Sequence, residues 1–389
     1  MIARIEIDLG AIRRNVATLG ATIAPARYAA VVKADAYGHG LVEVARAIAL
    51  DVAMVCVYRI EEAVAIRDAG LPTPILILGP IESRDLAVAV RARAAIALWN
   101  TGAFTRDLAR SACAIGMRAN VHAKIDTGVT RLGLDPTDAP AALVRYADDD
   151  ALELRGAFTH LAAAEELESS YTSEQLARFD AATAASRERF AARGIVRHAA
   201  ASAAAMLYPY ARLDLVRAGI ATYGIWPSEA TRDAIGKALV LEPALAWRTK
   251  LVVVRDVEAG RSVGYGCAFV TSRPSRIGVL PIGYAEGLPR ALSGAGEVIV
   301  RGTRVPIVGR ICMNMAFVDV TDVPRVATGD TVTLIGRDGE ETIGANELAA
   351  RAGTIGYELV ARLPATVPRV YTGRDANAAI ASATSIVRS

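Results

Sequence analysis

Short apolar runs alternate with Ala-, Glu- and Arg-rich stretches of helical spacing through roughly the first 230 residues of this chain. Such alternation predicts parallel strands joined by right-handed crossover helices. Eight repeats in this length match a closed (β/α)8 barrel of the TIM type, and an open doubly wound sheet is the competing architecture. The expected strands are 29–33, 53–57, 75–78, 95–98, 119–124, 154–159, 196–200 and 213–217. Helical spacing is clearest at 61–69, 83–91 and 173–193.

The pattern changes near residue 240, where strand-like runs are separated by Gly, Pro and Asp turns. The sequence therefore predicts an α/β chain with an N-terminal barrel, 8–238, and a mainly β C-terminal domain formed by 1–7 plus 239–389. Strands are expected at 245–257, 277–282, 297–300, 305–320 and 331–335. Helices are expected only at 345–351 and 356–362.

Composition excludes several classes of protein. The 44 basic and 41 acidic residues nearly balance, and the arginines are spread along the chain, so no nucleic-acid partner is expected. The four cysteines lie far apart, which excludes a metal or redox motif of short spacing and favours a reduced, cytoplasmic protein. Residues 1–8 alternate like a strand, and no apolar run approaches the roughly 18 residues that cross a membrane.

The segment 31–40 carries the most specific chemical signal. Two valines precede Lys33 at the end of an expected strand, and Tyr37 and two glycines follow. A lysine on such a rigid strand is well placed to form a Schiff base with a carbonyl cofactor, and the turn behind it offers N–H groups to a phosphate. The alternative is an ordinary lysine before a Gly-rich turn.

Other polar residues stand at the ends of further barrel strands. Because catalytic groups of such barrels come from the carboxyl ends of several strands, we expect these residues to meet at one rim. The rim would attract a phosphate and a carboxylate. Its expected members are Lys33, Lys124, Arg131, His160, Ser202 and Arg217.

Each member also has a plainer interpretation when it is taken alone. His160 fits a core histidine, and Ser202 fits a helix N-cap. The arginines at 131 and 217 could pair with Asp126 and Asp214. Their joint position at successive strand ends favours a functional site.

Taken together, the motifs resemble those of the alanine racemases, which are fold-type III pyridoxal-phosphate enzymes. The resemblance runs nearly end to end and implies a (β/α) barrel followed by a β domain. It also implies pyridoxal 5'-phosphate as cofactor, alanine as substrate, D-alanine supply for peptidoglycan, and a homodimer with shared active sites. It rests on 31–40, 124–133, 156–160, 217–224, 263–266, 282–290 and 309–313.

The resemblance implies two bases and a carboxylate clamp. Lys33 would hold the cofactor and act as one acid/base, and Tyr265 of the partner subunit would act as the other. Arg131 and the backbone of Met313 of the partner subunit would hold the substrate carboxylate. Lys124 matches a position that family members often carry as a carbamate, which would orient Arg131.

The remaining implied roles concern the cofactor and the approach to it. Arg217 would face the pyridine nitrogen, His160 would connect Tyr265 with Arg217, and Tyr284 would line the entrance. The phosphate would be surrounded by Tyr37, Ser202, the backbone of Gly219 and Ile220, and Tyr357.

This arrangement agrees with the chemistry of racemisation. Proton removal on one face and return on the other requires two bases on opposite sides of a planar intermediate. A lysine and a tyrosine, whose ordinary pKa values are near 10, serve only if cationic neighbours lower those pKa values. Arginine does not readily give up its proton, so Arg217 would leave the ring nitrogen unprotonated and disfavour transamination.

Three positions depart from the family pattern. Ala201 stands where asparagine is usual, Asn314 stands where aspartate is commoner, and 128–131 reads Gly-Val-Thr-Arg in place of Gly-Met-Gly-Arg. These departures leave open a serine or broader-specificity racemase of the same fold. A non-enzymatic pyridoxal-phosphate carrier is a further alternative, but it would have no use for Tyr265 and Met313.

Overall fold

The computed structural model describes residues 2–373, so 374–389 of the predicted second domain lie outside the described residues. Contacts divide the chain into two compact units. The barrel unit comprises Ile12–Ala36 and Leu41–Leu241. The β unit comprises Met1–Ala11, Tyr37–Gly40 and the chain from Glu242 onward.

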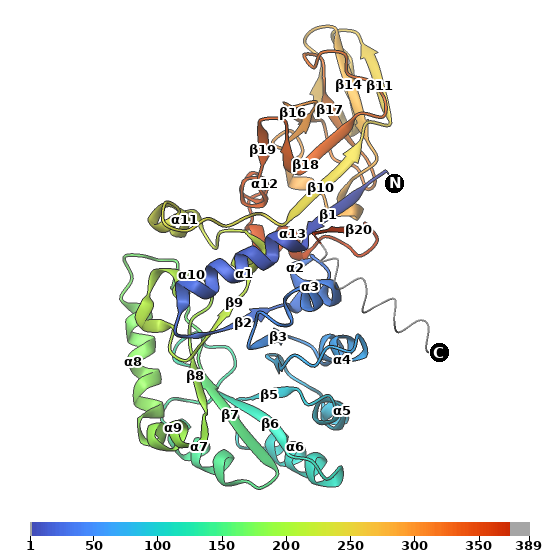
Figure 1. Ribbon diagram of the computed structural model, residues 1–389. Coiled ribbons are helices and arrows are strands. Elements are labelled where there is room, and N and C mark those ends of the chain that lie inside the picture. The colour runs from blue at the N-terminus through green and yellow to red at the C-terminus, as the bar shows by residue number, and fades with distance from the viewer. Residues whose placement is uncertain (1, 374–389) are drawn as a thin grey trace. The chain divides into compact units, whose positions relative to one another are not determined.

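The barrel unit is built on an eight-stranded parallel sheet (Figure 1). Its strands are almost entirely buried, as expected where helices cover a parallel sheet. The first and last strands of this order are joined by the N–H of Asp214, which donates to the Arg197 carbonyl at 3.1 Å, and by that of Arg217, which donates to the Ala200 carbonyl at 3.0 Å. The nearly closed barrel confirms the predicted fold class. In sheet order the strands are β8 (Val196–His198), β7 (Leu152–Phe158), β6 (Ala119–Lys124), β5 (Ala95–Leu98), β4 (Ile75–Ile77), β3 (Met54–Val57), β2 (Arg27–Val31) and β9 (Leu215–Ala218).

Amphipathic helices connect these strands. In α3 (Leu41–Ile48), the buried residues recur at the i, i+3, i+4 and i+7 positions that place them on one face. The expected helical stretch 173–193 is interrupted by a 3-10 turn at Ala184–Ser186 and ends at Gly194 in a left-handed conformation. The other helices are α1 (Leu9–Ile23), α4 (Ile60–Asp68), α5 (Leu86–Arg91), α6 (Ala103–Ala114), α7 (Ala139–Asp148), α8 (Tyr171–Thr183), α9 (Arg187–Arg193), α10 (Ser202–Leu207) and α11 (Glu229–Ile235).

The β unit contains a second, mixed sheet, in which the strands Arg4–Asp8 and Leu245–Lys250 alternate buried and half-buried residues. The N-terminal strand β1 (Arg4–Asp8) pairs antiparallel with β10 (Leu245–Lys250) and parallel with β20 (Arg369–Thr372). The other strands of this sheet are β11 (Val253–Val257), β14 (Ser275–Leu280), β15 (Glu297–Val300), β16 (Thr303–Val308), β17 (Ala316–Asp319), β18 (Thr331–Asp338) and β19 (Glu341–Ile343). A separate antiparallel pair is formed by β12 (Ser262–Val263) and β13 (Phe269–Val270).

The expected strands 245–257 and 305–320 are each divided in two. The second division leaves a loop between β16 and β17 that carries Met313. Two helices, α12 (Ala345–Arg351) and α13 (Gly356–Ala361), lie where the sequence predicted them.

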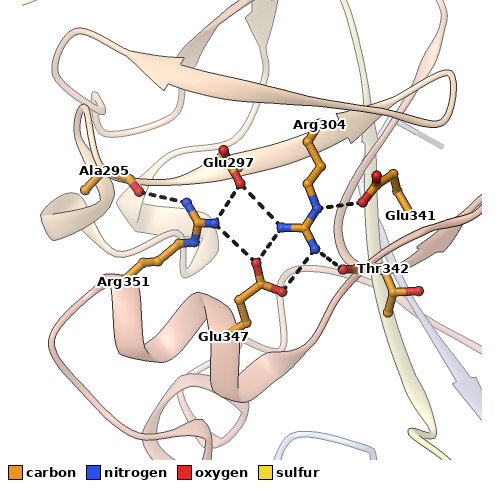
Figure 2. A network of polar contacts seen from close by, with 7 residues as sticks. All are labelled: Ala295, Glu297, Arg304, Glu341, Thr342, Glu347 and Arg351. Atoms are coloured by element: carbon orange, nitrogen blue, oxygen red, sulfur yellow. Dashed lines mark hydrogen bonds and ion pairs between the residues drawn. The ribbon is translucent and has the colours of Figure 1, made fainter.

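An ion-pair network fastens α12 to the strands of the β unit (Figure 2). Arg304 contacts Glu297, Glu341 and Glu347, and Arg351 contacts Glu297 and Glu347. Across residues 2–373, none of the helices combines the length and apolar character needed to cross a bilayer.

Candidate active site

Lys33 begins a short left-handed turn that follows β2. Ala34, Asp35, Ala36 and Tyr37 all have φ of 53–54°, a conformation that L-residues adopt at a cost of about 1 kcal/mol each. The sequence predicted a turn here but not its hand. A run of strained residues directly behind a lysine indicates that the surrounding structure holds the lysine in a fixed position.

Two carboxylates hold this turn. Glu62, in the first turn of α4, accepts the N–H of Ala34 at 2.6 Å, and its second oxygen accepts those of Tyr58 and Arg59. Asp35 accepts the N–H of Leu41 at 2.8 Å, where α3 begins. The backbone around Lys33 is therefore fastened to two helices.

The surroundings of Lys33 favour a neutral amine. Burial lowers the pKa of Lys33, and the charges of Arg131 and Arg217 lower it further, while Glu62 opposes them. The neutral amine is the form that attacks a carbonyl and accepts a proton. Lys33 is thus equipped for both tasks that the sequence assigns to it.

Arg217, in β9, is buried and hydrogen-bonded on both terminal nitrogens. One donates to Nδ1 of His198 at 2.7 Å, and the other donates to the carbonyls of Thr159 and Ala199. Burial lowers the pKa of Arg217 to about 10, so the guanidinium still carries its charge at neutral pH. Arg217 does not pair with Asp214, whose carboxylate instead accepts the N–H of Arg197.

The loop after β6 folds around Asp126. Its carboxylate accepts the N–H groups of Gly128, Val129, Thr130 and Arg131. Burial alone would raise the pKa of Asp126, but these four bonds outweigh burial and lower it. Because four backbone N–H groups already bond to the Asp126 carboxylate, Asp126 does not pair with the Arg131 side chain. That side chain is exposed and forms no ion pair within residues 2–373.

Lys124 and His160 are the remaining predicted members of the rim. Burial, followed by the charges of Arg131 and Arg217, lowers the pKa of Lys124 to about 8. Burial and the same arginines lower the pKa of His160 to about 3, which keeps its ring neutral. Within residues 2–373 Arg217 bonds to His198 and forms no hydrogen bond with His160, and the expected connection of Tyr265 with Arg217 through His160 stays a prediction.

Ser202 lies at the start of α10 and connects it with the turn after β9. Its hydroxyl accepts the N–H of Gly219 at 3.0 Å and that of Ala221 at 3.4 Å. The hydroxyl proton of Ser202 remains able to donate. The buried N–H of Ile220 makes no hydrogen bond within the described part of the chain. Ser202, Gly219 and Ile220 are the residues predicted to surround a phosphate, and that role stays a prediction.

The β unit holds the other predicted residues. The rings of Tyr37 and Tyr357 lie 6.3 Å apart. Tyr265, in a short 3-10 turn at Tyr265–Cys267, is 71% exposed, and Met313 is 57% exposed. Tyr284 is also exposed.

Two loops of the β unit are fastened to each other. The N–H of Tyr284 donates to the Cys312 carbonyl and that of Ala285 to the Met313 carbonyl. A Cβ at Gly283 would lie 2.2 Å from the Cys312 oxygen, so only glycine permits this approach. The amide of Asn314 donates to Glu286 at 2.8 Å, which adds a side-chain hydrogen bond between the two loops.

Sequence reasoning missed Glu62, His122 and His198. Glu62 has the spacing of a helix N-terminal capping carboxylate, which could have revealed it. The two histidines interrupt apolar barrel strands in a chain with only 4 histidines, which is the signal that could have revealed them. Within residues 2–373, no group of three or more His, Cys, Asp and Glu side chains is placed to hold a metal ion.

Comparison with known families finds two matches that together cover most of the chain. A model of the alanine racemase N-terminal domain matches residues 7–227. A model of the alanine racemase C-terminal domain matches residues 244–371.

Individual proteins show the same similarity. The alanine racemase of Symbiobacterium thermophilum is 41% identical, over 95% of this chain and 97% of its own length. The crystal structure of alanine racemase from Streptomyces lavendulae aligns with a TM-score of 0.89 at 33% identity, covering 97% of this chain and 98% of that one. The Bacillus anthracis enzyme, solved with bound L-Ala-P, aligns with a TM-score of 0.84 at 34% identity, covering 96% of both chains.

Proposed function

Since this chain belongs to the alanine racemase family, we propose that it interconverts L-alanine and D-alanine with pyridoxal 5'-phosphate bound at Lys33. The single observation that carries the proposal is the placement of Lys33 just after β2, beside the buried Arg217 of β9, the strand that pairs with β2. The serine racemase and carrier alternatives are not favoured, because the similar proteins are alanine racemases along nearly their whole length.

The residues of the barrel rim fit this cofactor. The N–H of Ile220 and the hydroxyl of Ser202 offer donors to a phosphate, and Lys33 offers a nucleophilic amine. When bound, pyridoxal 5'-phosphate withdraws electrons from Cα of an amino acid and so makes its hydrogen acidic. Tyr37 and Tyr357, whose ring centroids lie 6.3 Å apart, are proposed as further phosphate neighbours, as the resemblance to the family implies.

Arg217 is proposed to face the pyridine nitrogen. Its guanidinium keeps its proton at neutral pH and is held in place by His198 and two carbonyls. A donor that does not release its proton leaves the ring nitrogen neutral, which limits electron withdrawal and favours return of the proton to Cα.

Proton transfer is proposed to use Lys33 on one face and Tyr265 of the partner subunit on the other. The exposed Tyr265 and Met313 of each chain support a homodimer with shared sites, because large exposed apolar groups mark interaction surfaces. Arg131 is proposed to bind the substrate carboxylate, because its exposed side chain has no carboxylate partner within residues 2–373. A supply of D-alanine for peptidoglycan is the proposed use, and a cytoplasmic location stays a prediction.

Lys124 is proposed to carry a carbamate that orients Arg131. A pKa of about 8 leaves part of this amine unprotonated near neutral pH, and the unprotonated amine is the form that reacts with carbon dioxide. Intact-mass measurement in bicarbonate, compared with Lys124→Arg, would detect the added group.

Incubation of the holoenzyme with L-alanine in deuterated water tests the reaction. We expect D-alanine and deuterium at Cα, and we expect borohydride to attach the cofactor to Lys33. Tyr265→Phe should block exchange mainly from one enantiomer. Equal loss from both enantiomers would contradict the two-base scheme, and faster turnover of L-serine than of L-alanine would contradict the substrate.

A further inference from the structure

A cavity of about 590 Å³ lies at the end of the barrel opposite to the candidate active site. Its wall includes the first residues of several strands, among them Arg27 of β2, Met54 of β3 and Leu215 of β9. The candidate catalytic residues follow the carboxyl ends of the same strands. The cavity is therefore separate from the rim that holds Lys33.

The wall of the cavity is basic. It contains Arg27, Arg67, Arg93 and Arg155, and no carboxylate is among the residues that line it. Arg155 is paired with Glu153 at 2.7 Å, and Arg67 donates to backbone carbonyls. The side chains of Arg27 and Arg93 have no hydrogen bond or ion pair within the described chain. Two guanidinium groups thus face this region without a counter-charge.

A buried histidine adds a directed donor to the same wall. His122 lines the cavity, and its Nδ1 lies 2.9 Å from Nε2 of His198. A Cβ at position 156 would lie 2.4 Å from this Nδ1, so Gly156 makes room for the ring. His122 is 1% exposed, and its Nε2 makes no hydrogen bond within residues 2–373.

The direction of the hydrogen bonds follows from Arg217. A guanidinium can only donate, so Nδ1 of His198 accepts and Nε2 of His198 carries the proton. Nε2 of His198 then donates to Nδ1 of His122, and Nε2 of His122 carries the remaining proton. Both rings stay neutral, because burial first and Arg217 second lower their pKa values, that of His122 to about 3. The chain of bonds ends at the Nε2–H of His122, one of the residues that line the cavity.

We propose that this cavity binds a small organic anion, whose carboxylate or phosphate group contacts Arg27, Arg93 and Nε2 of His122. Guanidinium groups bind both kinds of oxyanion in a forked geometry. The volume lies within the roughly 300–1,000 Å³ of small-molecule sites, and Met54, Pro72 and Pro74 supply apolar wall for the rest of the molecule. No step of racemisation requires this site. Because His122 is hydrogen-bonded to His198, and His198 accepts a bond from Arg217, an anion bound in the cavity would also affect the hydrogen bond of Arg217.

Calorimetric titration of the holoenzyme with citrate and, separately, with glycerol 3-phosphate tests the proposal. We expect one of these probes to bind, and the double variant Arg27→Gln/Arg93→Gln to weaken its affinity by ~10-fold or more. Arg91→Gln is the matched control, because Arg91 is exposed, lies two residues from Arg93 and does not line the cavity. Arg131→Gln separates the two ends of the barrel and should leave the affinity unchanged. Preference for citrate or for glycerol 3-phosphate would identify the carboxylate or the phosphate as the recognised group.

A second measurement locates the bound probe. With only 4 histidines in the chain, isotope-labelled histidine gives few signals, and those of His122 should shift on titration. The proposal is wrong if neither probe binds, if Arg91→Gln weakens binding as much as the double variant, or if Arg131→Gln abolishes it. It is also wrong if a probe binds while the His122 signals stay unchanged.

Discussion

The candidate functional residues of the barrel rim and those of the β-unit loops differ in burial. Arg217 and Lys124 are buried, and the backbone around Lys33 is fixed by Glu62. Tyr265 and Met313 are exposed in the described chain. The rim is therefore preorganised within one chain, whereas the loops present groups that a second surface would cover. This difference is what a site shared between two subunits requires.

Mixing of two inactive variants should produce the largest change in activity, and it tests whether each active site is shared between two subunits. Lys33→Ala and Tyr265→Ala should each be inactive alone. In randomly mixed dimers, one site of each heterodimer regains both residues, so activity should return to about one quarter of wild type. Mixing after dissociation and refolding, followed by a racemisation assay, measures the recovery.

Two Lys33→Ala preparations that carry different tags provide the control, because their dimers form without an intact site. Recovered activity that is absent from isolated heterodimers would contradict the shared site. It would also remove the reason for the exposure of Tyr265.

Acid should destabilise the barrel unit through its buried histidines. His122, His160 and His198 all lie in this unit, and burial lowers the pKa of each, to about 3 for the first two. An unfolded histidine takes up a proton below about pH 6.5, whereas the folded ring does not. The stability that depends on these rings being neutral is therefore fully present above about pH 6.5, and it is lost as the pH falls toward 3. For each histidine the free energy of unfolding falls by about 1.4 kcal/mol per pH unit.

Urea unfolding of the protein between pH 6.5 and 5 measures this slope, because the carboxylates titrate mainly below that window. His122→Gln should reduce the slope by about one proton. An unchanged slope would show that the ring of His122 is already charged in the folded protein.

Glu62 tests how the rim is preorganised. Glu62→Gln removes a charge and one of the two oxygens that accept the N–H groups of Ala34, Tyr58 and Arg59. We expect a loss of about 2 kcal/mol in stability and a lower kcat, because the left-handed turn behind Lys33 loses an acceptor. Thermal unfolding and steady-state kinetics measure the two effects.

Glu61→Gln is the matched control, because Glu61 is exposed in the same first turn of α4 and makes no contact with the turn at 34–37. Equal effects of the two substitutions would show that only the charge at the start of α4 matters. The positioning role of Glu62 would then be wrong.

The sequence predicted the barrel strands well, because parallel strands buried on both faces read as short, continuous apolar runs bounded by helices. It predicted the polar residues at the strand ends for the same reason. It did not predict the left-handed turn at 34–37, since alanine and tyrosine carry no preference for positive φ and the turn depends on Glu62. The bonds between His122, His198 and Arg217 depend on ring orientation across three strands, which no local pattern encodes.

Substitution of Thr130 should have the smallest effect on stability, and it tests how the loop before Arg131 is held. Thr130 has φ of 57°, a left-handed conformation that is unfavourable for a β-branched residue. This position is one of the three at which the sequence departs from the expected family pattern. The N–H of Thr130 donates to Asp126, and this bond offsets part of the cost of the left-handed conformation. Thr130→Gly should keep the bond, relieve the strain and raise stability by about 1 kcal/mol.

Val129→Gly is the control for this substitution. Val129 donates to the same carboxylate but is not among the residues of positive φ, so glycine there should only add freedom to the unfolded chain and lower stability. Urea unfolding of both variants, with KM for alanine as a second readout, separates strain from flexibility. If both substitutions lower stability equally, the positive φ of Thr130 carries no cost and the loop is held by Asp126 alone. If only Thr130→Gly raises stability and KM stays constant, the bonds to Asp126 suffice to fix Arg131, and the departure from glycine affects the fold rather than the binding of substrate.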